Sequence, residues 1–448
     1  MSLAPYADQS EYSRDTESIV YSNAYKRLAH KTQIIIKPTR DHFRSRLIHT
    51  EEVNQIAVSL GKRLSLNLEL ITAIAKAHDL GHTPFGHAGE RTLQLIIDRE
   101  LSTRFDKKTI KKETKKPGYR KSIFHHSLNS ARMLIKEKEF ENVSKEVISG
   151  VLTHSWSPWK VDNNPTHFPE CYESQVVAIA DQIASINHDT EDIIEGAPYT
   201  EFDKDRFCSE FIMGFRNKYP DSYNKLRNEV NSLIVDKSVE LGLGRQKRVE
   251  AFLSNIAEHS LKYFKDNSVT HKEQAKSFSI CLPKEWADLL RWYEFFIREL
   301  IQEKVSWFIA RDNMAGALIS TVFNHIWPRA RSSVTISQMK LPMFEKSEIT
   351  KSKLEEKTKY IEHFSDFFNE HYFDELNNRD IYQDYLNCVK LKGLSVWDTN
   401  IQHILAKISP DEHKTLNRLI AVIDFIAGLT DRYCLEMFDE VYQEFVIS

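Results

Sequence analysis

The fold is decided by residues 67–90, which read NLELITAIAKAHDLGHTPFGHAGE. Apolar side chains such as Ile71 and Ile74 recur at helical spacing, so we expect a buried helix from Asn67 to Leu80 with His78 on the same stripe. An aspartate and then a glycine follow shortly after this histidine, and in the plainest interpretation they only end the helix. The alternative interpretation is that the His-Asp pair binds a metal ion.

Two other helical runs carry comparable side chains on their apolar faces. Between Ser45 and Leu64 the spacing of apolar residues places His49 inward, and between Tyr172 and Asp192 it places Asp181 and His188 on one face. A buried carboxylate without a partner is costly, so Asp181 requires a cation or strong hydrogen-bond donors. A salt bridge to an Arg or Lys elsewhere in the chain is the alternative.

Together, these helices predict a metal site. His49, His78, Asp79 and Asp181 supply two imidazole nitrogens and two carboxylate oxygens, which suits a six-coordinate divalent ion with positions left for water and substrate. Mn²⁺, Mg²⁺, Fe²⁺ and Ni²⁺ agree with this donor set better than structural zinc does. Such an ion, with histidines nearby, is typical of phosphate ester hydrolysis.

Composition indicates a mostly helical protein. The chain has 448 residues but only 13 glycines and 13 prolines, which favours long helices over frequent turns. We therefore expect an all-α fold.

Charge and cysteine usage exclude several classes of protein. The 61 basic and 64 acidic residues give a net charge of −3, so the whole chain has no field that demands nucleic acid or an anionic membrane. Its five scattered cysteines form no CxxC pair, which predicts neither a disulfide framework nor a thiolate zinc site. No run of eighteen apolar residues occurs, and we expect a cytoplasmic protein without a membrane partner.

A strongly basic segment interrupts the core between residues 104 and 121. It holds nine Lys and Arg residues against Asp106 and Glu113, and Pro117-Gly118 is typical of a turn. The segment is expected to be an exposed loop. It is either merely solvated or a flap that attracts phosphates or nucleic acid.

Beyond the His-Asp pair, an ordered series of blocks carries a family resemblance. RDHFRSRLIHT at residues 40–50 and HDLGHTPFGHAGE at residues 78–90 resemble the HD-superfamily deoxynucleoside triphosphate triphosphohydrolases, closest to the bacterial dGTPase branch. The matching blocks cover most of residues 14–196 and a short C-terminal piece at residues 424–433. Residues 200–415 show no clear match. The resemblance therefore implies a phosphohydrolase core at residues 14–196, and we expect residues 200–448 to form a helical elaboration that completes the core and carries oligomer contacts.

The resemblance implies a role for each site residue. It assigns the metal to the four ligands named above and catalysis to His87 with Glu90, three positions later. It assigns substrate contacts to five further residues, namely Gln33, Arg46, His82, His126 and Asp189.

Alternatives stay open for the weaker assignments. His126 can be a surface histidine beside His125, Gln33 can cap the backbone, and Asp189 can cap or form a salt bridge. Position 185 departs from the family, which usually has tyrosine packed against the sugar where this chain has Ser185. The choice between deoxyribose and ribose is therefore open.

The implied reaction is hydrolysis of a deoxynucleoside triphosphate, with dGTP expected, to deoxynucleoside and tripolyphosphate. The resemblance also implies a Mn²⁺ or Mg²⁺ cofactor, a homo-oligomer, and a nucleotide or single-stranded DNA effector. Two alternatives remain at this point. One is an HD phosphohydrolase for a mononucleotide or cyclic nucleotide, and the other is a nucleotide-binding or single-stranded nucleic-acid-binding regulator with a vestigial site.

Overall fold

The computed structural model describes residues 10–33, 44–104, 124–157, 169, 171–196, 204–235, 241–269, 275, 279–300, 306–331 and 410–447. Regular structure in these ranges is helical, and the one β interaction there is an isolated bridge between Thr32 and Ser45. The prediction of an all-α fold is confirmed. No helix within these ranges is long and apolar enough to cross a membrane. The basic segment lies outside the described residues from residue 105 onward.

The chain divides into two compact units. Unit 1 contains residues 1–87 and 126–314, and unit 2 contains residues 88–125 and 315–448. The helices of unit 1 are α1 (Glu11–Tyr21), α2 (Asn23–Arg27), η1 (Leu28–His30), α3 (Arg46–Arg63), α4 (Leu68–Ala77), α7 (His126–Lys136), η2 (Lys138–Phe140), α8 (Lys145–Thr153), α9 (Tyr172–Gly196), α10 (Lys204–Lys218), α11 (Pro220–Val230), η4 (Asn231–Val235), α12 (Leu241–Asp266) and α13 (Lys284–Glu299).

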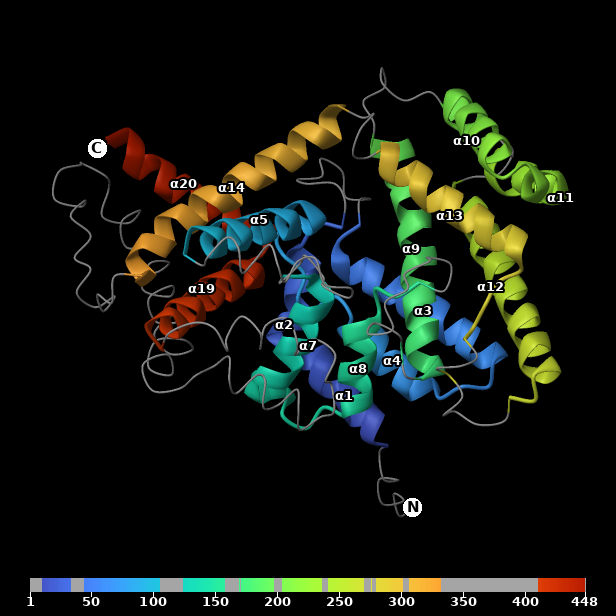
Figure 1. Cartoon of the computed structure of the whole chain (residues 1–448), viewed down its shortest axis with the longest axis horizontal. Helices are drawn as coiled ribbons and strands as arrows, with labels where there is room; N and C mark the ends of the chain where they lie inside the picture. The colour runs from blue at the N-terminus through green and yellow to red at the C-terminus, as the bar shows by residue number, and fades with distance from the viewer. Residues whose placement is uncertain are drawn as a thin grey trace, which may run out of the picture. The chain divides into compact units, whose positions relative to one another are not determined.

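The core of unit 1 is built on the three helices that the sequence singles out. α3 packs against both α4 and α9, and α8 packs against α4 and α9 in turn (Figure 1). Val53, Ile71, Ile74 and Val177 are fully buried where these helices meet. Burying such side chains stabilises the fold by about 1.5–3 kcal/mol each, so this packing holds the polar groups beside it in place.

Local sequence signals set where these helices begin. The side chain of Asn67 accepts hydrogen bonds from the backbone N–H groups of Glu69 and Leu70, which caps α4. At the start of α8, the Ser144 backbone and hydroxyl both donate to the buried carboxylate of Asp15 on α1. A satisfied buried carboxylate therefore ties the first helix to the core.

Unit 2 consists of residues from α5 (Gly86–Arg104), α14 (Ser306–Arg331), α19 (Pro410–Gly428) and α20 (Asp431–Ile447). α5 and α14 each begin in unit 1 and continue into unit 2. Within unit 2 the indole N–H of Trp327 donates to Glu100 at 2.8 Å. The described residues after 200 are mostly helical, and the division into a core at residues 14–196 and an elaboration at residues 200–448 stays a prediction.

Candidate functional site

The His-Asp pair lies in a turn directly after α4. The helix ends at Ala77, and His78 is its C-terminal cap residue. The Leu80 N–H then donates to the Ala77 carbonyl at 3.3 Å, and the His82 N–H donates to the Asp79 carbonyl at 3.1 Å. The predicted helix to Leu80 therefore ends earlier, because these two tight turns replace regular helical hydrogen bonds.

One nitrogen of His78 is held by the backbone, and the other is left without a partner. The Nδ1 atom lies 2.7 Å from the carbonyl oxygen of Ala75, and because a carbonyl only accepts, Nδ1 carries the proton. The Nε2 atom therefore keeps its lone pair. This atom is buried and has no hydrogen-bond partner among the described residues. A buried nitrogen in this condition is typical of a metal ligand.

All four predicted metal ligands converge on this nitrogen. His78 Nε2 lies 3.6 Å from Asp79 Oδ1 and 3.9 Å from Asp181 Oδ1. His49 Nε2 lies 3.0 Å from the same Asp181 oxygen and 4.0 Å from Asp79 Oδ2. In the described part of the chain, the ion pairs of Asp181 are with these histidines and not with an Arg or Lys. Three separate helices thus bring two imidazoles and two carboxylates together.

The charges around the two aspartates keep them ionised. Burial raises the pKa of Asp79, but its electrostatic interactions with His78 and with the Arg46 guanidinium outweigh burial and hold that pKa well below its usual value. For Asp181, burial is likewise outweighed, by its hydrogen bond to His49 and its electrostatic interaction with His78, so the pKa of Asp181 is also lowered. Both groups are therefore anionic near neutral pH, as cation binding requires.

Arg46 contacts Asp79 and lies close enough to His82, in a second polar cluster, for its charge to add to burial in lowering the pKa of that histidine. This first residue of α3 is almost fully buried, and its Nη1 donates to Asp79 Oδ2 at 2.5 Å. Its Nε and Nη2 atoms are buried and find no hydrogen-bond partner in the described ranges. Gly86, at φ +60°, leaves room beside Nη2, since an added Cβ would lie 3.1 Å from that atom. Two N–H donors of one guanidinium are thus available to an anion.

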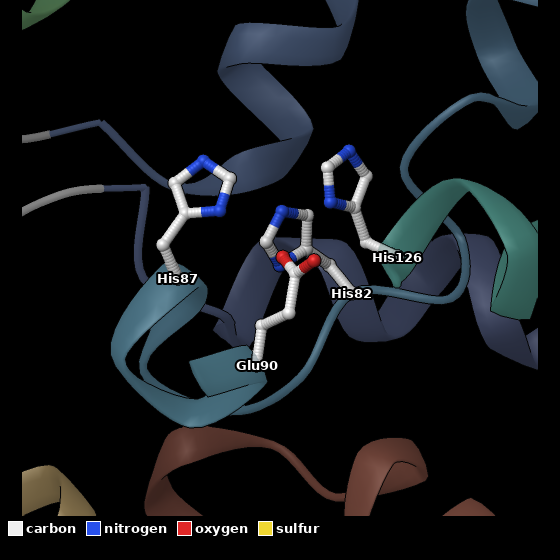
Figure 2. A group of neighbouring side chains, drawn as sticks. All are labelled: His82, His87, Glu90 and His126. Carbon is white, nitrogen blue, oxygen red and sulfur yellow. The ribbon is translucent and has the colours of Figure 1, made fainter. Parts of the chain in front are cut away.

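The second cluster contains three imidazoles. Figure 2 shows His82, His87 and His126 with their rings gathered, and each offers a ring nitrogen within 4.8 Å of the others. The His82 and His126 rings are stacked at 4.4 Å, and both residues are buried, whereas His87 is exposed. Glu90 follows His87 by one turn on α5, as predicted from their spacing. Within unit 2, a carboxylate oxygen of Glu90 lies 3.5 Å from His125 Nε2.

His154 is a site residue to which the sequence interpretation assigned no role. It follows α8 as its cap residue, and its Nδ1 donates to the Val151 carbonyl at 2.6 Å, while its Nε2 lies 3.1 Å from His126 Nε2. Burial, together with the electrostatic effect of His78, lowers the pKa of His154 to about 3, so the His154 ring is neutral near pH 7. The signal for it was a histidine that ends an apolar helix, the same pattern as His78.

The three remaining predicted positions lie in the same part of unit 1. The backbone oxygen of Gln33 would contact a Cβ on Gly86 at 3.1 Å, and the buried Oε1 of Gln33 has no partner within the described ranges. Asp189 lies near enough to His49 and Arg46 to be affected by their charges, but burial and then Asp192 dominate and raise its pKa to about 7. The Ser185 hydroxyl donates to Asp181 Oδ1 at 3.4 Å.

A helical core that holds paired histidines and aspartates in this way defines an HD domain, and the HD domain family model matches residues 46–186. A deoxyguanosinetriphosphate triphosphohydrolase-like protein of Caldanaerobacter subterraneus subsp. tengcongensis is 39% identical over 188 residues, or 42% of this chain and 47% of the relative. A protein of the same name from Clostridium tetani is 32% identical over 270 residues, which is 59% of this chain and 68% of the relative.

The chain therefore belongs to the family of HD-domain deoxyguanosinetriphosphate triphosphohydrolase-like proteins. A further relative with this name, from Desulfatibacillum aliphaticivorans, is 35% identical over 219 residues, or 48% of this chain and 56% of its own. The chain thus spans about half of the length of the Caldanaerobacter and Desulfatibacillum relatives, 47% and 56%.

Proposed function

We propose that this protein hydrolyses deoxynucleoside triphosphates, with dGTP as the expected substrate, to a deoxynucleoside and tripolyphosphate. One observation carries the proposal. The unpartnered His78 Nε2 lies among two carboxylates, and the unpartnered N–H donors of Arg46 lie next to one of them. A cation site and an anion site thus adjoin, and a metal-bound phosphate ester requires both.

The donor set supports a resident divalent ion. His49, His78, Asp79 and Asp181 would hold it, and Mn²⁺ or Mg²⁺ is proposed, with Fe²⁺ or Ni²⁺ as alternatives. When bound, the ion supplies charge that polarises a phosphoryl oxygen and orients water. The two ionised aspartates balance that charge, and burial of both histidines excludes competing hydrogen bonds from bulk solvent.

Arg46, His82 and His126 are proposed to bind the triphosphate. The Nε and Nη2 atoms of Arg46 and the Nδ1 atom of His82 are buried without a hydrogen-bond partner among the described residues. Burial and the nearby charge of Arg46 hold the pKa of His82 well below its usual value, so this ring is neutral and can donate a hydrogen bond without adding charge. Stacking on His126 fixes its orientation.

His87 and Glu90 are proposed to move the proton. Water attacks the α-phosphorus, the bond to the 5′-oxygen of the nucleoside breaks, and the proton lost by the water reaches that oxygen. His87 lies at the exposed edge of the imidazole cluster, where it can take and return a proton, and Glu90 on the next turn would orient its ring. No glycine-rich phosphate loop takes part, because the sequence contains none.

Gln33 and Asp189 are proposed to contact the sugar, the latter at its 3′-hydroxyl. Ser185 would pack less closely against the sugar than the tyrosine usual in the family. Ribonucleotides must therefore be tested beside deoxynucleotides. We also propose a cytoplasmic homo-oligomer in which a nucleotide or single-stranded DNA is a candidate effector. The basic segment, which the described residues omit, would be one place for such a ligand.

Product analysis tests the proposal. The protein is incubated with each dNTP and NTP and with Mn²⁺ or Mg²⁺, and the products are separated by chromatography. Tripolyphosphate and nucleoside are expected, and orthophosphate or pyrophosphate would instead favour another nucleotide ester as substrate. Binding of nucleotide without turnover would favour a regulator with a vestigial site. His78→Ala is expected to abolish turnover, whereas the exposed His30→Ala serves as the matched control.

A further inference from the structure

The face of His49 that points away from the metal ligands contacts a second histidine. His49 Nε2 is directed at Asp181, and its Nδ1 lies 3.1 Å from the Nδ1 atom of His188 on α9. The two rings meet edge to face, with their centres 5.2 Å apart, and both side chains are about 1% exposed. Because neither ring reaches solvent, each nitrogen in this contact must find its partner within the protein.

His188 in turn contacts a carboxylate. Its Nε2 pairs with Glu52, which lies one turn after His49 on α3. Two arginines hold this carboxylate in place, since Arg245 Nη1 lies 3.1 Å and Arg44 Nε lies 3.6 Å from its oxygens. A chain of contacts thus runs from Glu52 through His188 to His49.

The proton positions along this chain follow from what a bound cation requires. A cation bound at His49 Nε2 takes the place of the proton that this atom otherwise donates to Asp181, so Nε2 then presents its lone pair and the proton of that ring is on Nδ1. His188 Nδ1 must then accept this proton, which leaves the single proton of His188 on Nε2, facing Glu52. An ionised carboxylate accepts only, so every donor in the chain meets an acceptor. The reverse arrangement would put a proton on His49 Nε2 and prevent ligation.

We propose that His188 and Glu52 are positioning residues that fix the proton of His49 on Nδ1 and so direct the Nε2 lone pair to the metal ion. His78 obtains the same result from the backbone carbonyl of Ala75. His49, by contrast, depends on side chains, which substitution can remove. The inference rests on the metal site proposed above and adds two residues that the sequence interpretation left without a function.

Metal affinity tests this proposal. The dissociation constant for Mn²⁺ is measured by calorimetry on the full chain. His188→Ala should weaken binding by about tenfold or more, the usual effect of losing a partner behind a ligating histidine. His188→Asn keeps a carbonyl oxygen near the position of Nδ1 and should stay within about threefold of the original affinity. Glu52→Gln should fall between them, and the exposed His30→Ala and Glu258→Gln serve as controls.

A spectroscopic measurement separates positioning from a merely structural role. In ¹⁵N-histidine-labelled protein loaded with Mg²⁺, a hydrogen bond between the two Nδ1 atoms should give a ¹⁵N–¹⁵N coupling between His49 and His188. Equal affinities of His188→Ala and the unaltered protein, or absence of the coupling, would overturn this inference alone. Failure of the unaltered protein to bind Mn²⁺ would overturn the metal site as well. Melting temperatures of the metal-free variants show whether each one folds. If His188→Ala does not fold, Glu52→Gln takes its place in the test, and equal Mn²⁺ affinities of Glu52→Gln and the unaltered protein would overturn the inference.

Discussion

Replacing Gly81 by alanine should disturb the candidate site strongly, although it adds only one methyl group. Gly81 follows the His-Asp turn where the start of α7 passes closest. An added Cβ would lie 2.2 Å from the Ser130 backbone nitrogen and 2.5 Å from the Asn129 carbonyl carbon. Both contacts are with backbone atoms, so no side-chain rotation relieves them. Gly81→Ala must therefore push α7 away from the turn.

The cost can be worked from the hydrogen bonds that this separation breaks. The Gly81 N–H donates to Ser130 Oγ at 2.8 Å, and Asn129 Nδ2 donates to the Gly81 carbonyl at 2.9 Å. The Ser130 hydroxyl also donates to the His78 carbonyl at 2.8 Å. At about 1 kcal/mol for each buried bond, Gly81→Ala should lower the free energy of unfolding by about 3 kcal/mol.

Urea denaturation, followed by circular dichroism, measures this change. Gly428→Ala is the matched control, because its added Cβ would have no neighbour within 4 Å. The control should leave stability unchanged or raise it by up to about 1 kcal/mol, since alanine favours a helix over glycine. Equal stabilities of the two variants would refute the close approach of α7 to the turn.

Three further predictions address other parts of unit 1. The pKa of Asp189 is raised to about 7. At pH values between the ordinary carboxyl pKa and about 7, the folded state therefore holds a proton that the unfolded state has lost. In this pH range the free energy of unfolding should fall by up to about 1.4 kcal/mol per pH unit as the pH rises. In urea titrations, Asp189→Asn should therefore be more stable than the original protein at pH 8, and the difference in stability between the two should be smaller at pH 5. Asn67→Ala removes the cap of α4 and should cost about 1 kcal/mol in the same assay, and no loss would contradict the cap. Arg46→Lys keeps the charge but loses the paired N–H donors, so calorimetry should show tripolyphosphate binding weakened by about tenfold, and unchanged affinity would exclude Arg46 from the anion site.

The helices that carry the proposed metal ligands were predictable because the buried side chains of a helix recur at a regular spacing in the sequence. The inward positions of His49 and Asp181 follow from apolar residues at helical spacing, and both lie where that spacing places them. The end of α4 was less predictable. A local turn at His78 decides it, and periodicity carries no information about hydrogen bonds in a turn.

Contacts between distant segments were harder to predict. The spacing places His188 on the face of Asp181, yet it does not show that Glu52 on another helix meets that ring. His154 and His126 contact each other through the packing of α7 on α8, which sequence separation alone does not reveal. Pairings of this kind depend on tertiary geometry, so one sequence could indicate the candidates but not the partners.

Crystals soaked in Mn²⁺ would test the metal site most directly. The anomalous difference map should show one strong peak in contact with His49 Nε2, His78 Nε2, Asp79 and Asp181. A peak among His82, His87 and His126 instead, or no peak beside His78 at saturating Mn²⁺, would contradict the site on which the proposed hydrolysis depends.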